Sequence, residues 1–295
     1  MSAGTMNTST PTLHSVFLRD AAGIAARHAE VLKPSWGKRL PPLIGIGAAL
    51  GLLVFGMISL GFSVGMFVDG AANLGFIVGL MIPPNPESWG RVVFYLGQLA
   101  QTVGIAFLGT TVAAALAFPF GFLAARNVVP SAIVHVLTRR SFDTLRGVDT
   151  LVWALMWINV VGLGPFAGTL AIICSDFGTF GKLFSETIET ADRKSVEGVL
   201  SAGGTDVHAT RFGVLPQVLP VITSQVLYYF ESDTRSATII GIVGAGGIGL
   251  SLSEMINTLE WHQVSFIILI LLVTVSVIDW LSTKLRLAII GARPV

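Results

Sequence analysis

Charged side chains are scarce in this sequence. Only 12% of its 295 residues are Asp, Glu, Lys or Arg, whereas hydrophobic residues make up 53% and the mean hydropathy is +0.77. A soluble domain of this length carries about twice that share of charge. The composition therefore excludes an ordinary water-soluble protein and predicts an all-α protein with several membrane spans.

The residue patterns of several functional sites are also missing. No G-x-x-x-x-G-K-[ST] segment is present, so the chain lacks the loop that cradles ATP phosphates in many ATPases. The five histidines are scattered without metal-ligand spacing, and the net charge of +1 does not favour nucleic acid as a partner. The single cysteine, Cys174, cannot form an internal disulfide. We expect no catalytic residue, no metal and no cofactor bound by this chain.

Apolar runs of the length that crosses a membrane, about 20 residues, alternate with polar segments. Residues 63–90 contain Pro83-Pro84-Asn85-Pro86 and predict an external loop with room for an interfacial helix. Residues 212–253 would measure about 60 Å as one helix, twice the hydrocarbon core, so part of them must be re-entrant or interfacial. The pattern predicts six spans: residues 43–62, 99–122, 151–162 and 166–185, a fifth starting at Pro220, and residues 261–278.

The distribution of Lys and Arg residues along the chain supports the prediction of six spans. With six spans and both termini in the cytoplasm, nearly all Lys and Arg residues lie on the cytoplasmic side, as the positive-inside rule requires. The predicted organisation is a cytoplasmic tail (1–40), a first span with an external loop (41–98), a core of five spans (99–285) that includes a polar cytoplasmic loop (186–216), and a C-terminal tail (286–295).

The polar loop contains the most specific motif. Glu197 and Gly198 are followed by Gly203 and Gly204 and then by Leu215-Pro216. This spacing resembles the cytoplasmic signature of ABC importer permeases: Glu-Ala-Ala, three residues, Gly, nine residues and Ile-x-Leu-Pro. Gly198 and Val199 replace the two alanines, and Gly213 replaces the isoleucine. The pattern predicts a short helix, a glycine turn and a second segment, which together form a knob for docking on a motor subunit.

Other segments resemble the phosphonate-uptake permease family over about residues 80–285. Asp233 is a departure, because that family usually has Asn there. The segments that carry the resemblance are Met81-Ile82-Pro83-Pro84, Gly121-Phe122-Leu123-Ala124-Ala125-Arg126-Asn127, residues 161–168 and 181–189, Phe230-Glu231, Arg235-Ser236-Ala237-Thr238 and residues 243–249.

The resemblance implies a type I ABC importer permease in a bacterial inner membrane, surrounded by lipid and paired with a second copy of itself. Two cytoplasmic ATPase subunits, which hold ATP and Mg²⁺, would dock at residues 197–216, and an external binding protein would deliver the substrate. Alternating access would then move a phosphonate inward. Phosphate, phosphite and hypophosphite stay open as cargo, because the binding protein sets most of the specificity.

Charged residues interrupt the fifth predicted span. Counted from Pro220, Glu231 and Arg235 lie about 16 and 22 Å along the helix, near the middle of the membrane, where charges usually pair or face a cavity. Two interpretations stay open. The i,i+4 pair Glu231–Arg235 only locks helices together, or Arg235, with Asp233 and Ser236, lines a path for an oxyanion.

Four glycines, Gly244, Gly246, Gly247 and Gly249, match G-x-G-x-x-G. A dinucleotide site needs this motif between a strand and a helix, which a membrane segment does not provide. We expect a glycine-rich bend or gate at the outer face.

Two functions of other classes would require other sequence features. A secondary transporter driven by an ion gradient would have inverted repeats with acidic residues in both halves, and none is recognisable. An intramembrane enzyme would need catalytic residues converging at one depth, and only Glu231, Asp233 and Arg235 qualify.

Overall fold

A computed structural model describes residue 23 and residues 36–129 and 131–291. Most of the predicted N-terminal tail and the last four residues lie outside this part. Contacts group the chain into two units, residues 1–73 and 74–295. Within the described residues all regular structure is helical, which confirms the all-α prediction.

The first unit contains α4 (Trp36–Ser59) and the beginning of α5 (Val64–Leu80). α4 starts before Pro41-Pro42, whereas the sequence placed the start of the span after them. α5 occupies most of the segment predicted as an external loop, and it is apolar but only 17 residues long.

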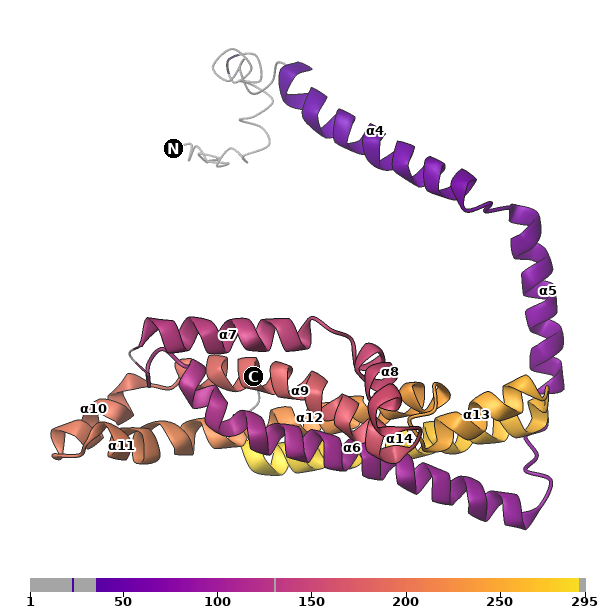
Figure 1. The fold of residues 1–295 in the computed structure, drawn as a ribbon. Helices are drawn as coiled ribbons and strands as arrows, with labels where there is room; N and C mark the ends of the chain where they lie inside the picture. Colours follow the sequence, from indigo (N-terminus) through magenta and orange to yellow (C-terminus); the bar gives the residue numbers. More distant parts are fainter. Residues whose placement is uncertain (1–22, 24–35, 130, 292–295) are drawn as a thin grey trace, which may run out of the picture. The chain divides into compact units, whose positions relative to one another are not determined.

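The second unit is a helical bundle (Figure 1). Its elements are α6 (Trp89–Ala124), α7 (Ala132–Arg146), α8 (Thr150–Val161), α9 (Pro165–Glu189), α10 (Arg193–Ser201), α11 (Asp206–His208), the π-helix η1 (Ala209–Val214), α12 (Leu215–Ile242), α13 (Ile248–Asn257) and α14 (Trp261–Ile290).

Three of the described helices, α4, α6 and α14, are long and apolar enough to cross a membrane. α9 and α12 have 25 and 28 residues but carry charges, and α8 has only 12 residues, about 18 Å, which is too short to cross alone. The count of six spans therefore stays a prediction. The predicted break at Gly162-Leu163-Gly164-Pro165 is confirmed, because α8 ends at Val161 and α9 begins at Pro165.

A stripe of small residues on α6 brings α9 close. Gly109, Ala113, Ala117 and Gly121 recur every four residues and are buried. A Cβ atom at Gly109 would come within 2.7 Å of the Ile172 Cβ, and one at Gly121 within 2.9 Å of the Phe184 Cβ. Small residues allow this approach of two backbones inside a membrane bundle. The main core forms where α6 and α9 also meet α12, around Phe180, Phe184, Val218 and Ile222.

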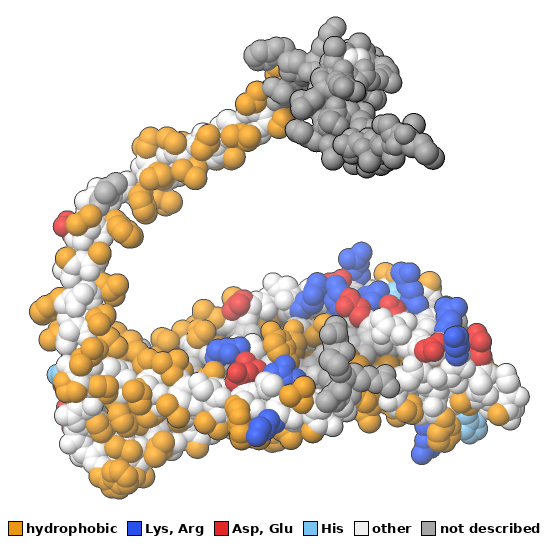
Figure 2. Space-filling model, turned by 180° about the vertical axis from the view of Figure 1, so that it is seen from behind, with side chains coloured by type: hydrophobic (Ala, Val, Ile, Leu, Met, Phe, Trp, Pro, Cys, Tyr) orange, Lys and Arg blue, Asp and Glu red, His pale blue; other side chains and the backbone are white. Residues whose placement is uncertain are grey.

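Charge is distributed unevenly along this bundle. Figure 2 shows hydrophobic side chains around the end that carries α13, and basic and acidic side chains gathered toward the end that carries α10. This is the distribution expected if the α13 end lies in lipid and the α10 end in water.

Candidate functional site: the loop at α10, the charged cluster and the glycine bend

The predicted knob is present as a compact helical element. Glu197 and Gly198 lie on α10, an amphipathic helix capped by Asp192, whose side chain accepts a hydrogen bond from the Lys194 amide. Gly203 follows the helix with φ +87°, and the Gly204 amide donates to the Val199 carbonyl at 3.0 Å. A glycine in this left-handed conformation ends many helices. The predicted order of short helix, glycine turn and second segment is therefore confirmed.

The departures from the motif have physical explanations. Gly213 packs on the backbone of α10, and a Cβ atom there would lie 3.1 Å from the Val196 Cα. An isoleucine here would require the α10 backbone to shift by a few tenths of an ångström. Gly198, by contrast, faces open space, so the alanine that it replaces is not needed for packing. Glu197 is exposed and has no hydrogen-bond or ion-pair partner among the residues described, which leaves its carboxylate free for another molecule.

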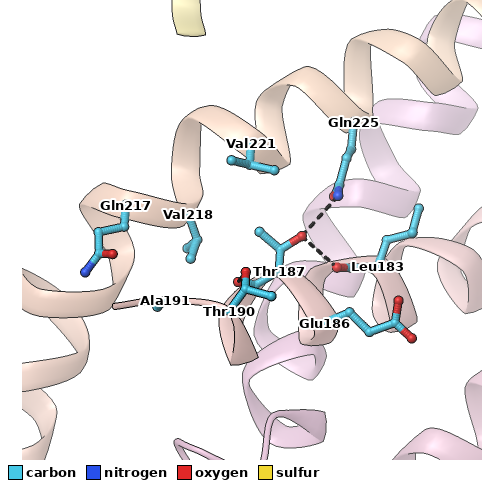
Figure 3. A pocket seen from close by; sticks show the side chains of 9 residues that line it. All are labelled: Leu183, Glu186, Thr187, Thr190, Ala191, Gln217, Val218, Val221 and Gln225. Carbon is cyan, nitrogen blue, oxygen red and sulfur yellow. Dashed lines mark hydrogen bonds between the residues drawn. The ribbon is translucent and has the colours of Figure 1, made fainter. Parts of the chain in front are cut away.

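Gln217, which the sequence did not single out, ties this element to α12. Leu215 and Pro216 begin α12, and the Gln217 side chain one residue later accepts from the Asp192 amide at 2.9 Å and donates to the Gly213 carbonyl at 2.6 Å. Gln217 also lines a pocket of about 290 Å³ between the last turns of α9 and the first turns of α12 (Figure 3). A displacement of α10 would therefore be transmitted to α12.

In the same pocket, the side chain of Gln225 on α12 forms a hydrogen bond with α9. Its side-chain nitrogen donates to the Thr187 hydroxyl at 3.0 Å, and that hydroxyl donates to the Leu183 carbonyl at 2.9 Å (Figure 3). The Gln225 Oε1 atom is buried without a partner. The two helices thus share a polar contact close to α10.

The predicted pair of Glu231 and Arg235 exists, with 3.2 Å between Arg235 Nη1 and Glu231 Oε1. A third residue, Arg286 of α14, lies 3.6 Å from Glu231 Oε2. The cluster therefore has one positive charge more than it has negative charges, and it is not a self-neutralised pair. No sequence signal marked Arg286, because it lies far along the chain in the predicted C-terminal tail.

Arg286 lies eight residues beyond residue 278, where the sequence ended the last predicted span, and α14 continues to Ile290. The depth of this cluster in the membrane stays a prediction. Arg235 lies one turn further along α12, and 49% of its side chain is exposed. The half-buried Ser236 donates to the Ser232 carbonyl of its own helix.

Asp233 does not join this cluster. It is buried on the other side of α12, where its carboxylate accepts from the Thr110 hydroxyl at 2.6 Å and faces the carboxyl group of Asp176 on α9. The Asp176 Oδ2 atom is buried without a partner. Asp233 therefore does not share the exposed face of Arg235, and its carboxyl group lies among α6, α9 and α12; its place in the translocation path stays a prediction.

Three of the four glycines form a bend between α12 and α13, where a bend was predicted. Gly244, Gly246 and Gly247 have φ values of +100°, +84° and +78°, and Gly249 lies in the first turn of α13. The bend packs on the break between α8 and α9, where the Gly164 amide donates to the Gly244 carbonyl at 3.0 Å.

α6 holds the other side of this bend. Gln101 and Thr102 accept hydrogen bonds from the amides of Gly247 and Ile248 at 2.9 and 2.8 Å. No strand precedes the bend in the described part of the chain, so a dinucleotide fold is excluded there.

Comparisons with known proteins agree with this arrangement. Residues 117–289 match the family model of the binding-protein-dependent transport system inner membrane component. The chain is 37% identical over 206 residues to the phosphate-import permease protein PhnE of Mycolicibacterium smegmatis, covering 70% of this chain and 38% of that protein. It is 33% identical over 192 residues to the phosphite transport system permease protein PtxC of Stutzerimonas stutzeri, covering 65% and 70%.

Among solved structures, a chain of the MetNI methionine ABC transporter in an inward-facing conformation superimposes with a TM-score of 0.61. The match covers 68% of this chain and 99% of that one at 14% identity, and so concerns the fold alone.

Proposed function

The chain belongs to the family of binding-protein-dependent transport system inner membrane components, and on this premise we propose that it imports a phosphorus oxyanion as the permease subunit of an ABC transporter. The relatives named above carry phosphate and phosphite, and the sequence resembles phosphonate permeases. The observation that carries the choice of an oxyanion is the cluster of Glu231, Arg235 and Arg286, with its excess positive charge.

Arg235 is the residue that would meet the anion. It belongs to a face of α12 on which exposed side chains recur every seven residues, at Val221, Tyr228, Arg235 and Ile242. That spacing is close to two helical turns, so these side chains lie along one line. We place the translocation path, and the contact with a second copy of the chain, along this face.

A guanidinium binds a phosphorus oxyanion through parallel N–H groups. Glu231 competes with the anion for Arg235 at 3.2 Å, which keeps the contact weak enough for release. Neighbouring Ser236 adds a hydroxyl next to the cation.

Two cytoplasmic ATPase subunits would bind ATP and Mg²⁺ and dock on α10 through the free carboxylate of Glu197. Movement of α10 would reach α12 through Gln217 and reopen the path inward. The glycine bend at residues 244–249 would act as the outer gate, below an external binding protein. The polar end of the bundle and both termini would then lie in the cytoplasm.

Deleting the gene for this chain tests the proposal. Uptake of radiolabelled phosphate, phosphite, hypophosphite and methylphosphonate is measured in the deletion strain, with and without the chain supplied in trans. We expect loss of uptake of at least one of these anions and restoration by the chain. Unchanged uptake of all four would refute the proposed cargo.

Energy depletion separates this mechanism from a secondary transporter. Uptake by an ABC importer should persist when a protonophore collapses the ion gradient at constant ATP, and it should stop when ATP is depleted. The opposite result would identify an ion-driven carrier.

A further inference from the structure

A second group of cations lies away from α12, between α7 and α9. Its pocket, of about 270 Å³, is lined by basic side chains with two carboxylates among them. The lining residues are Arg126, His135, Val136, Arg139, Arg140, Asp143, Lys182 and Glu186.

Positive charge exceeds negative charge here. Asp143 is shared by three cations, with Lys182 and Arg146 at 3.2 Å and Arg140 at 3.8 Å. The hydrogen bond from Lys182 holds the pKa of the Asp143 carboxyl below its usual range, so this group stays ionised. A single carboxylate cannot neutralise three cations, and part of their charge stays available.

Two arginines add to this surplus. Arg139 pairs with Glu189 at 3.3 Å, but its Nε atom is buried without a partner. The exposed Arg126 forms no ion pair with any described residue, and its Nε donates to His135 Nε2 at 2.9 Å. His135 Nδ1 lies 2.7 Å from the Ala124 carbonyl and must donate to it, so Nε2 is the acceptor.

An apolar surface adjoins these cations. The neighbouring pocket on α7 has a volume of about 490 Å³ and is lined by Ala132, Ile133, Val136, Leu137 and Arg140. Val136 and Arg140 line both pockets. Ile133 and Leu137, one helical turn apart, are 79% and 68% exposed, which in water would be unfavourable for a helix of this composition.

We propose that this surface of α7 and α9 binds an anionic phospholipid of the inner leaflet. The cations of the polar pocket bind the phosphate of the headgroup, and an acyl chain lies on Ile133, Val136 and Leu137. Basic pockets on the cytoplasmic side of membrane helices bind such headgroups. A free phosphate ion would use the cations but not the apolar pocket. The inference rests on the proposed membrane orientation, although not on the cargo.

Native mass spectrometry of the full-length chain in detergent micelles tests the site with phosphatidylglycerol, phosphatidylcholine of the same acyl chains, and inorganic phosphate. We expect preferential binding of phosphatidylglycerol. Arg126→Gln with Arg140→Gln should weaken it by about tenfold or more. The control, Arg211→Gln with Lys284→Gln, removes the same charge from exposed positions outside both pockets and should leave binding unchanged.

A second variant, Ile133→Ser with Leu137→Ser, separates the two sources of phosphate. It should weaken phosphatidylglycerol binding while all pocket cations are kept. Equal affinity of both lipids, an equal loss in the control, or displacement of the lipid by millimolar inorganic phosphate would overturn the proposal. These outcomes are independent of uptake, so failure of the lipid site is distinguishable from failure of the transport function.

Discussion

The carboxylate of Glu231 lies between two arginines, because Arg286 of α14 approaches it at 3.6 Å while Arg235 of its own helix approaches it at 3.2 Å. One carboxylate cannot neutralise both guanidinium groups. This relationship favours the interpretation in which Arg235 contacts an oxyanion, since an isolated i,i+4 pair would present no net charge to an anion. It also connects the C-terminal end of α14 to α12.

Arg235→Gln tests the role of the exposed cation. Loss of a charge-assisted contact should reduce oxyanion uptake by about tenfold or more. Glu231 keeps Arg286 as its partner, so the amount of assembled complex should not change. Lys284→Gln is the matched control. Lys284 is an exposed cation on α14 whose ammonium group lies over the Trp280 ring and forms no ion pair with Glu231. Normal uptake by Arg235→Gln would argue for a purely structural pair.

Gly213→Ile restores the motif residue and should nevertheless impair the protein. The new side chain meets the backbone of Val196, and overpacking of this kind costs about 1–3 kcal/mol. We expect α10 to be displaced, so that less substrate is imported for each ATP hydrolysed. The measurement is uptake and ATPase activity together in the reconstituted transporter.

Gly198→Ala is the contrasting motif restoration. Its Cβ atom meets nothing within 4 Å, and alanine favours a helix over glycine by about 1 kcal/mol. Coupling should be normal and thermal stability equal or higher. Equal behaviour of the two variants would contradict the packing assigned to Gly213.

Asp233→Asn should stabilise the bundle. The amide oxygen can still accept from Thr110, while the new N–H group can donate to the unpartnered Oδ2 atom of Asp176. Asp233→Leu should destabilise it by about 1–3 kcal/mol, because the buried carboxyl group of Asp176 would then face an apolar side chain and Thr110 would keep only the Ala106 carbonyl as its acceptor. Thermal unfolding in detergent measures both changes. A lower melting temperature for Asp233→Asn would show that the second carboxyl group is needed.

Gly249→Ala tests the close approach at the bend. A Cβ atom at Gly249 would collide with the Thr238 carbonyl oxygen, a backbone atom that cannot rotate away, so the melting temperature should fall. Gly97→Ala on α6 is the control, since its Cβ would meet no atom within 4 Å. The same change in both variants would mean that the bend has space for a side chain.

Much of this protein follows from local sequence. A segment inside a membrane must satisfy its own backbone hydrogen bonds and is therefore helical. The apolar runs of the sequence indicate which segments these are. Glycine and proline determined the break before Pro165 and the bend at residues 244–247, and the spacing from Glu197 to Pro216 determined the element at α10. The i,i+4 geometry of a helix alone was sufficient to pair Glu231 with Arg235.

Only the tertiary structure decided which residues of other helices these elements contact. Arg286 reaches Glu231 because α14 packs beside α12, and Asp233 turns away from Arg235 because residues two apart point to different faces of a helix. The small residue at position 213 is favoured by its close packing on the backbone of Val196, which lies seventeen positions earlier in the chain. Contacts of this kind depend on the packing of whole helices, which a linear pattern of residue types does not specify.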